Sequence, residues 1–291
     1  MKKNNLFSIP FTFSAVLFNI FFLISAIFNV GCMQFRTSDK RVWKKFEAIP
    51  QKVQVERYQV ANRTVRYIKI GADTLPTVLF IHGAPGSADA FFSYLKDTVL
   101  LEKARMISVD RPGYGYSDFG KAEVSVAQQA KLIAPLLDQF ANGHPFLVVG
   151  HSYGGTIAAR LAMDFPEKVD YLIMAAPAID PDNEKKFWVN NPADWAIFKW
   201  AIPKAVRVSN DEKLAHVAET AKMLPDWQKV TMPVTYIHGE KDGIVPFANA
   251  AFAKEVLQHN PDTTFILKEK MGHLFVFNEK EVLKEAILAY L

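Results

Sequence analysis

Short apolar runs alternate with amphipathic stretches through most of the chain, which predicts a sheet with helices between its strands. Six runs are rich in β-branched or aromatic residues, at 77–83, 105–110, 146–150, 171–177, 234–239 and 263–269. Amphipathic stretches lie mostly between them, at 124–140, 156–164, 247–258 and 279–290. Continuous apolar runs are typical of strands that are buried on both faces. We therefore expect an α/β fold with a mainly parallel, doubly wound sheet.

Two earlier segments, 53–60 and 64–71, alternate apolar and polar residues on either side of Asn62. A period of two residues is typical of a strand with one solvated face, and Asn is favoured in tight turns. These segments are expected to form an antiparallel hairpin at an edge of the sheet.

The interval from Ala178 to Met232 is too long for an ordinary connection between a strand and a helix, which takes roughly 2 to 6 residues. We expect a small helical cap inserted into the sheet domain at 178–232. Its aromatic residues would cover an apolar substrate cavity, or alternatively would only pack the cap against the sheet. They are Phe187, Trp188, Trp195, Phe198, Trp200 and Trp227.

The first 32 residues have the pattern of a signal peptide or membrane anchor. No charged residue lies between Lys3 and Arg36, and this apolar stretch exceeds the roughly 20 residues that a helix needs to cross a bilayer. Lysines ahead of such a stretch are typical of segments that send the remaining chain across the membrane. A polar, basic linker at 33–50 is expected to lead to a domain at 51–291.

Cys32, the only cysteine of the chain, ends this apolar segment. A lone cysteine cannot form an intramolecular disulfide. The stretch "NVGC" resembles the lipobox of bacterial lipoproteins, in which the signal peptide is cut before a lipidated cysteine, although Asn29 departs from the aliphatic residue preferred there. The resemblance implies lipidation of Cys32 and a place in the bacterial cell envelope, on the periplasmic or outer face. The alternative is an uncleaved helix from about Leu6 to Val30.

Composition narrows the possible partners. Half of the 291 residues are hydrophobic and 22% are charged, as in a globular protein with a large core. The net charge of +4 falls to +2 without Lys2 and Lys3, and no basic stripe occurs, so we expect no nucleic-acid partner. The seven histidines show neither H-E-x-x-H nor Cys/His spacing, so we expect no metal. No cofactor is expected either. The expected partners are a small-molecule substrate and, through the N-terminal segment, a membrane.

Ser152 is the candidate nucleophile. It lies in "GHSYG", which fits G-x-S-x-G, after the strand-like run 146–150 and before the helix-like stretch 156–164. In this setting the serine occupies a strained strand-to-helix turn that exposes Oγ at the carboxyl edge of the sheet. Because serine is a weak nucleophile at neutral pH, it needs a histidine to take its proton and an acid to orient that histidine.

His273 and Asp242 are the candidates for these two roles. His273 stands in a Gly-containing loop after the last predicted strand, and Asp242 follows the predicted strand 234–239. Both loops should lie at the carboxyl edge of the sheet. Glu240 and Asp180 are weaker candidates for the acid.

The stretch "HGAPGS", residues 82–87, is a Gly- and Pro-rich loop after a predicted strand. Acyl transfer needs N–H donors where the oxyanion forms, each worth on the order of 3 kcal/mol. The backbone N–H groups of Ala84 and Tyr153 are the candidate oxyanion-hole donors. His82 is expected to hold the loop structurally.

Together these motifs resemble the α/β-hydrolase superfamily, in the large group with an "HG-x-PG" loop, over residues 51–291. The stretch "DRPGYGYSD" is similar to the family's D-x-x-G-x-G-x-S turn, in which Asp110, Gly113, Gly115 and Ser117 have a structural role.

The resemblance implies an α/β-hydrolase fold and a serine hydrolase that cleaves an ester or related acyl bond of a small, partly apolar substrate through an acyl-enzyme. Ser152, Asp242 and His273 follow the chain order Ser, Asp, His that this family uses. The serine also excludes the epoxide hydrolases and haloalkane dehalogenases of this fold, which use Asp at the elbow.

Other activities of the same fold stay open. "HGAPG" is similar to the "HGGPG" of proline iminopeptidases, in which case Asp194, Glu212 or Glu219 would hold a free amino terminus. A carbon–carbon bond hydrolase would use the same serine. The alternative that is not an enzyme is a catalytically silent binding protein.

Overall fold

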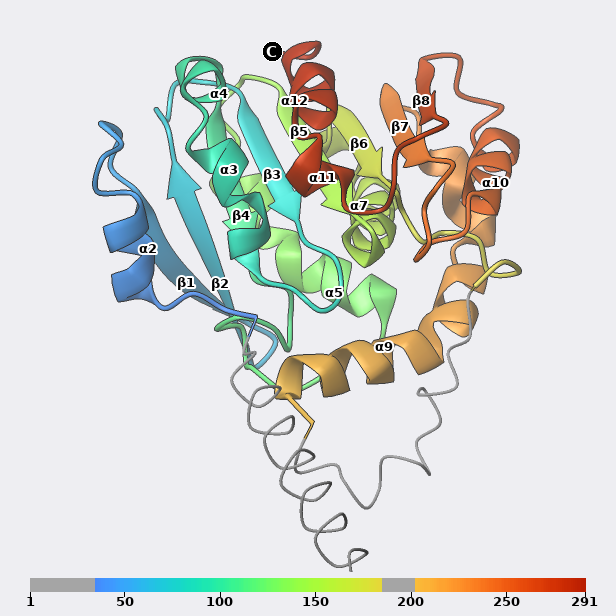
Figure 1. Cartoon of the computed structure of the whole chain (residues 1–291), viewed down its shortest axis with the longest axis horizontal. Helices are drawn as coiled ribbons and strands as arrows, with labels where there is room; N and C mark the ends of the chain where they lie inside the picture. Colours follow the sequence, from blue (N-terminus) through green and yellow to red (C-terminus); the bar gives the residue numbers. More distant parts are fainter. Residues whose placement is uncertain (1–34, 185–201) are drawn as a thin grey trace, which may run out of the picture.

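The computed structural model describes residues 35–184 and 202–291, which fold around one eight-stranded sheet (Figure 1). The strands are β1 (Gln54–Val60), β2 (Arg63–Ile70), β3 (Thr77–Ile81), β4 (Arg105–Val109), β5 (Phe146–His151), β6 (Tyr171–Ala175), β7 (Val234–Gly239) and β8 (Thr263–Lys268). Their order is β1-β2-β4-β3-β5-β6-β7-β8. β3 to β8 pair in parallel, and β2 pairs antiparallel with both β1 and β4. The predicted mainly parallel sheet is confirmed.

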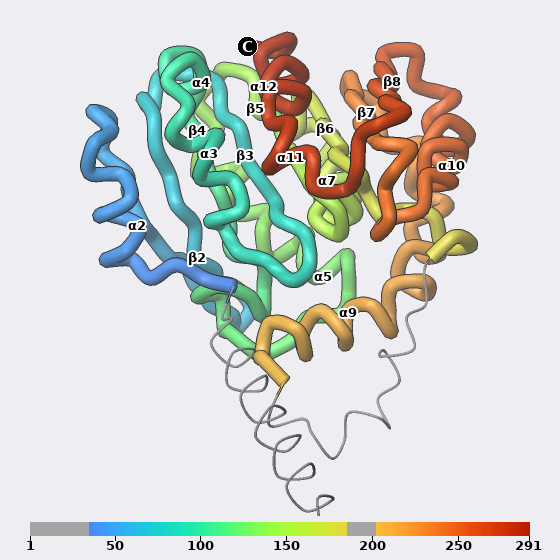
Figure 2. Tube along the Cα trace, viewed as in Figure 1, coloured from blue at the N-terminus to red at the C-terminus, as the bar shows by residue number. Residues whose placement is uncertain are grey.

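The first two strands form the predicted hairpin. Gln54 pairs with Lys69 at one end and Val60 with Arg63 at the other. Ala61 and Asn62 make the turn between them, with φ of 47° and 61°. Two consecutive left-handed residues match the twist of a tight antiparallel hairpin. The hairpin lies at one edge of the sheet, and β8 lies at the other (Figure 2).

Alternate residues of each strand face opposite sides, so the sheet carries two cores. In β3, Leu79 and Ile81 join one core, and Val78 and Phe80 join the other. The first core is covered by α5 (Val126–Ile133), α6 (Pro135–Gln139), α7 (Tyr153–Asp164) and α10 (Ala248–Val256). The second is covered by α2 (Asp39–Lys45), η1 (Ala88–Phe91), α3 (Phe92–Leu95), α4 (Thr98–Lys103), α11 (Phe275–Asn278) and α12 (Glu281–Leu288).

Part of the predicted cap lies in the described chain. α9 (Lys204–Ala221) crosses the end of the body towards which β3 points, at the carboxyl edge of the parallel strands (Figure 1). Trp227, in η4 (Leu224–Lys229), is 2% exposed and packs edge-on against Phe252, with 6.1 Å between ring centroids. Trp227 therefore belongs to the core rather than to a substrate cavity. The other cap aromatics lie outside the described residues: Phe187, Trp188, Trp195, Phe198 and Trp200.

Residues 35–46, predicted as part of a linker, pack on the sheet domain instead. Val42 of α2 is fully buried, and the ring of Phe46 meets that of Phe92 edge-on at 5.1 Å. The sequence does not predict this packing, because lysines and the exposed Trp43 lie between Val42 and Phe46. The folded domain thus begins before residue 51.

The predicted signal or anchor at 1–32, with Cys32, lies outside the described residues. Within 35–184 and 202–291, none of the helices has the length and apolar character needed to cross a bilayer.

Candidate active site

Ser152 sits on the turn between β5 and α7. Its backbone has φ of 57° and ψ of −127°, which residues other than glycine seldom adopt. Its N–H donates to the carbonyl of Ala175 at 2.9 Å, and its own carbonyl accepts from the N–H of Gly155 at 2.8 Å. These hydrogen bonds hold the strained strand-to-helix turn that the sequence predicts.

Two glycines let residues 82–87, the candidate oxyanion loop, approach this turn. A Cβ atom on Gly83 would lie 2.9 Å from Cβ of Ser152, and one on Gly154 would lie 2.1 Å from the carbonyl oxygen of Ile81. Both distances are shorter than real Cβ contacts, so a side chain at either position would push the two segments apart. Ala84 follows Gly83 and Tyr153 follows Ser152. The two candidate oxyanion donors therefore belong to the two segments that meet here.

His82 joins the candidate oxyanion loop to the loop after β4. Its Nδ1 donates to the carbonyl of Gly83 at 2.7 Å, and its Nε2 accepts from the N–H of Arg111 at 3.0 Å. Burial, together with the Arg111 guanidinium, lowers the pKa of His82 well below its ordinary value, so the ring is neutral. These contacts match the structural role expected for His82.

Asp242 and His273, in the loops after β7 and β8, contact each other directly. His273 Nδ1 lies 2.7 Å from Asp242 Oδ2, and Asp242 Oδ1 accepts from the N–H groups of Ile244 and Val245, each at 2.8 Å. Burial would raise the pKa of Asp242, but hydrogen bonds from His238 and His273 outweigh it and hold this pKa below its ordinary range. The ionised carboxylate places the imidazole proton on Nδ1 of His273 and leaves Nε2 with a lone pair.

His238 is a second partner of Asp242, and its role is not apparent from the sequence. Its Nε2 lies 3.1 Å from Asp242 Oδ2, and its Nδ1 lies 2.7 Å from the hydroxyl of Tyr236. The hydroxyl can donate to Nδ1 while Nε2–H donates to the carboxylate, so all three groups are satisfied. In the sequence, the pair of His238 and Asp242 is indicated only by their separation of four positions across the end of β7.

His151 connects the His273 loop to the nucleophile turn. Its Nε2 donates to the carbonyl of His273 at 3.0 Å, and the two rings lie 4.8 Å apart. Burial, with the neighbouring His273, lowers the pKa of His151 to about 3. Ser152 follows His151, so this contact brings His273 beside the turn. The hydrogen bonds among the described residues do not include one between Ser152 Oγ and His273.

The two weaker acid candidates have other surroundings. Glu240 is exposed. Asp180 is buried, and its carboxylate accepts from Asn183 Nδ2 at 2.7 Å and from the N–H of Asp182 at 2.9 Å. Of the three candidates, Asp242 is the one that hydrogen-bonds to His273.

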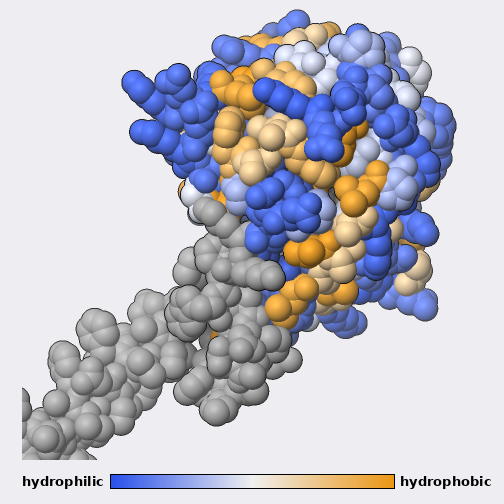
Figure 3. All heavy atoms as spheres, turned by 90° about the vertical axis from the view of Figure 1, so that its right-hand side faces the viewer, coloured by the Kyte–Doolittle hydropathy of each residue, from blue (hydrophilic) through white to orange (hydrophobic). Residues whose placement is uncertain are grey.

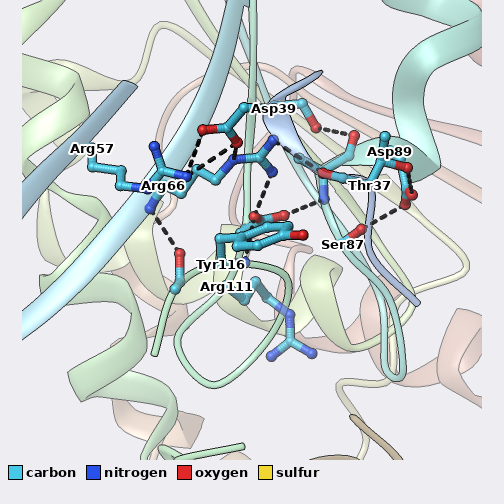
Figure 4. A network of polar contacts seen from close by, with 12 residues as sticks. Thr37, Asp39, Arg57, Arg66, Ser87, Asp89, Arg111 and Tyr116 are labelled. Carbon is cyan, nitrogen blue, oxygen red and sulfur yellow. Dashed lines mark hydrogen bonds and ion pairs between the residues drawn. The ribbon is translucent and has the colours of Figure 1, made fainter. Parts of the chain in front are cut away.

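The loop after β4 is structural, as the resemblance implies. Asp110 is fully buried, accepts from the N–H of Ala88 at 2.7 Å, and pairs with the guanidinium of Arg66 at 2.8 Å. Ser117 Oγ accepts from the N–H of Arg66 at 2.8 Å. A Cβ atom on Gly115 would lie 2.1 Å from the Asp110 carboxyl carbon, so no side chain fits there. Figure 4 shows the polar network around Arg66.

A buried ion pair attaches α9 to the candidate oxyanion loop. The carboxylate of Glu212 contacts the Arg111 guanidinium at 2.6 and 3.2 Å, and neither side chain is exposed. The same guanidinium donates to the carbonyls of His82 and Gly83 at 2.8 and 3.3 Å. The hydroxyl of Tyr114 donates to Glu212 at 2.6 Å. α9 is therefore linked to the backbone that carries the candidate donor.

These contacts engage two of the acids that an iminopeptidase would need. Glu212 is bound to Arg111, while Glu219 accepts from the N–H of Val126 at 2.9 Å and pairs with Lys222. The third acid, Asp194, lies outside the described residues. Over the described ranges, no three or more His, Cys, Asp and Glu residues are grouped so as to hold a metal ion.

Comparison with known proteins supports the fold. The family model described as "alpha/beta hydrolase fold" matches residues 76–197. The thioesterase domain from the curacin biosynthetic pathway superposes with a TM-score of 0.63 over 82% of this chain and 99% of that chain, at 16% identity. The chain has the α/β-hydrolase fold.

Two curated relatives are similar to this chain in sequence. The mitochondrial palmitoyl-protein thioesterase ABHD10 of Rattus norvegicus is 29% identical over 185 residues, which cover 57% of this chain and 58% of that protein. The poly(3-hydroxyalkanoate) depolymerase of Ectopseudomonas oleovorans is 24% identical over 273 residues, covering 84% of this chain and 94% of that protein. The chain spans between 26% and 58% of the length of the first curated relatives that it matches.

Proposed function

We propose that the protein is a serine hydrolase that cleaves an ester or related acyl bond of a small, partly apolar substrate. Ser152 is the nucleophile, His273 the general base, and Asp242 the acid that orients the base. The observation that carries this proposal is the 2.7 Å contact between His273 Nδ1 and Asp242 Oδ2, beside the turn that holds Ser152. The thioesterase and depolymerase names of the two relatives support acyl-bond hydrolysis by an enzyme.

The proposed reaction has two halves. Ser152 Oγ attacks the acyl carbon while its proton passes to His273 Nε2, and the N–H groups of Ala84 and Tyr153 donate to the oxyanion. The intermediate collapses when the leaving group takes the proton from His273, which leaves an acyl ester on Ser152. A water molecule then gives a proton to the same nitrogen and attacks the ester. As the acid is released, His273 returns that proton to Ser152 Oγ. The carboxylate of Asp242 stabilises the imidazolium in both halves.

A fluorophosphonate probe tests the assignment of Ser152. We expect one labelled peptide containing Ser152, and we expect Ser152→Ala to lose both the label and the hydrolysis of short p-nitrophenyl esters. Labelling at another residue, or none in folded protein, would overturn the proposal. A silent binding protein would show no turnover that depends on Ser152.

A substrate panel separates the ester hydrolase from the other enzymes of the fold. Glu212 and Glu219 are each already paired with a cation within the protein. We therefore expect esters to be favoured over aminoacyl amides, because the buried amino group of an aminoacyl substrate needs a free carboxylate. Faster turnover of prolyl amides or of carbon–carbon substrates than of esters would transfer the assignment to those classes.

We also propose that the domain lies outside the cytoplasm and is held to a bacterial membrane. The attachment is an acylated Cys32 or an uncleaved helix from about Leu6 to Val30. The uncharged stretch between Lys3 and Arg36 supports this proposal. Intact mass spectrometry of detergent-extracted protein distinguishes a chain that begins at an acylated Cys32 from a full-length chain, and a soluble cytoplasmic product would contradict both.

A further inference from the structure

The chain enters the folded domain beside the candidate active site. Phe35, the first described residue, packs against a small cluster of Tyr114, Ala205 and Val208, and Ala84 packs against the same cluster. Ala205 and Val208 belong to α9, and Ala84 belongs to the candidate oxyanion loop. The entry point therefore lies where the cap helix meets that loop.

Polar contacts hold the next residues in place (Figure 4). Thr37 Oγ1 donates to Asp89 at 2.6 Å, and the carbonyl of Thr37 accepts from Arg66 at 3.2 Å. Asp39 pairs with Arg66 at 3.1 Å and with Arg57 at 2.8 Å. Thr37 and Arg66 are buried, so these residues do not act as a free tether.

Very little chain separates this fixed point from the proposed membrane attachment. Cys32 precedes Phe35 by three residues, and Val30 precedes it by five. A fully extended chain spans at most about 3.5 Å per residue, so these separations reach no more than roughly 10 and 18 Å. An anchored chain must therefore hold the Phe35 edge of the domain close to the bilayer.

Exposed apolar side chains occur on α9 and in segments that follow strands of the sheet. Among the described residues, nine large apolar side chains are exposed, and six of them lie on α9 or in the segments that follow β4, β7 and β8. In side view, hydrophobic areas lie among hydrophilic ones from the upper to the lower part of the body, and α9 lies at the lower end in Figure 1 (Figure 3). Apolar side chains in contact with the headgroup region are what holds a surface against a bilayer. These six residues, the membrane face, are Val124, Leu214, Val217, Ile244, Leu274 and Phe277.

We propose that the membrane face lies against the bilayer and that the substrate is an acyl ester of a membrane lipid, which reaches Ser152 without crossing the water phase. This inference rests on the proposed hydrolase and its anchor. Leu274 follows His273, and Ile244 lies two residues after Asp242, so the apolar surface borders the residues that are proposed to perform the chemistry. Residues 35–39 are packed on the domain close to the proposed attachment, so they keep this apolar surface facing the lipid.

A matched pair of substitutions tests this orientation. Val217 on α9 and Val99 on α4 are each 39% exposed, and the two helices lie at opposite ends of the body (Figure 1). Full-length protein is placed in vesicles of phosphatidylethanolamine and phosphatidylglycerol that contain 4-methylumbelliferyl oleate, with soluble 4-methylumbelliferyl butyrate as the second substrate. Val217→Glu should lower oleate hydrolysis roughly fivefold because a charge is driven against the lipid, and should leave butyrate hydrolysis unchanged. Val99→Glu should change neither rate.

Equal oleate rates for Val217→Glu and wild type, or equal losses for the two variants, would overturn the inference. A chain that hydrolyses butyrate but does not float with the vesicles would also overturn it, while the proposed hydrolase would stand.

A second measurement does not depend on activity. Lys204, at the start of α9, and Lys103, at the end of α4, are both exposed. An amine-reactive, membrane-impermeant ester should label Lys204 several-fold less in vesicles than in detergent, with Lys103 unchanged. Equal labelling of the two lysines in vesicles would contradict the proposed orientation even if no substrate were turned over.

Discussion

At the residue scale, hydrogen bonds from several sides hold the carboxylate of Asp242. Four groups donate to its carboxylate: the rings of His273 and His238, and the N–H groups of Ile244 and Val245. A carboxylate with this many donors stays ionised and cannot rotate. It therefore fixes both the tautomer and the orientation of His273.

Replacing Asp242 by Asn should lower kcat by about four orders of magnitude, because the amide favours the wrong tautomer of the histidine. Steady-state hydrolysis of a p-nitrophenyl ester measures this loss, and circular dichroism checks the fold. Glu240→Gln and Asp180→Asn are the matched controls and should stay within about twofold of wild type, since neither acid touches His273. A large loss in Asp180→Asn alone would move the acid to the loop after β6.

His216 should make the folded protein sensitive to mild acid. Its Nε2 donates to the carbonyl of Ala178 at 2.9 Å, its Nδ1 is buried without a hydrogen-bond partner among the described residues, and burial lowers its pKa to about 4. The unfolded chain takes up this proton near pH 6.5, the ordinary pKa of histidine, so stability falls as the pH drops from about 6.5 towards 4.

The corresponding prediction is that His216→Gln flattens the pH dependence of stability. Its free energy of unfolding should fall less steeply than that of wild type between about pH 6.5 and pH 4, by up to roughly 1.4 kcal/mol per pH unit. Urea unfolding at several pH values in this window measures the slope. An unchanged slope would mean that the folded protein protonates His216 as readily as the unfolded chain does.

At the element scale, α9 depends on the pair of Glu212 and Arg111. Burial would lower the pKa of Arg111, but the adjacent Glu212 carboxylate outweighs this effect and raises it, so the guanidinium remains charged. A buried pair of this kind contributes little net stability, but removing one partner leaves a buried charge alone. The pair therefore determines where α9 can dock.

Glu212→Ala should lower the free energy of unfolding by about 3–5 kcal/mol, and the double variant Arg111→Met with Glu212→Leu should recover much of that loss. Chemical denaturation of the single and double variants measures both values. If the double variant is no more stable than Glu212→Ala, the cost comes from lost packing rather than from the unpaired guanidinium.

The element α2 provides a test of where the domain begins. Phe46→Ala should cost about 3–5 kcal/mol, because its ring is buried against Phe92. Trp43→Ala, three residues earlier and 52% exposed, should cost no more than about 0.5 kcal/mol. Equal and small effects of the two substitutions would restore the linker interpretation of this segment.

At the scale of the whole molecule, the sequence predicts the strands of the sheet better than the helices that cover it. Apolar runs identify the strands because both faces of the sheet are covered. The amphipathic stretch 124–140 forms two helices, α5 and α6, because Pro135 has no N–H to continue the first helix. α2 could not be predicted, because its burial depends on Phe92, which lies 46 residues after Phe46.

The candidate site also has parts that the sequence predicts and parts that it does not. The loops of Ser152, Asp242 and His273 could be predicted, since each follows a strand and the carboxyl ends of parallel strands share one edge. The contacts of His238 and Glu212 could not be predicted, because neither residue belongs to a recognisable motif and the partner of Glu212 is far away in the sequence. Local patterns identify where a loop starts, but not which side chains meet across loops.

The ion pair between Arg111 and Glu212 joins positions 101 residues apart, which bears on the order in which the protein folds. A contact between residues so far apart in the sequence has a large entropic cost of loop closure. It becomes favourable only after strands that are closer together in the sequence have paired. A nascent chain that ends before α9 already contains Ser152 but leaves the guanidinium at the oxyanion loop without its counter-charge. We therefore expect the candidate oxyanion loop to reach its final position late, after the sheet has formed and the chain has been synthesised beyond residue 212.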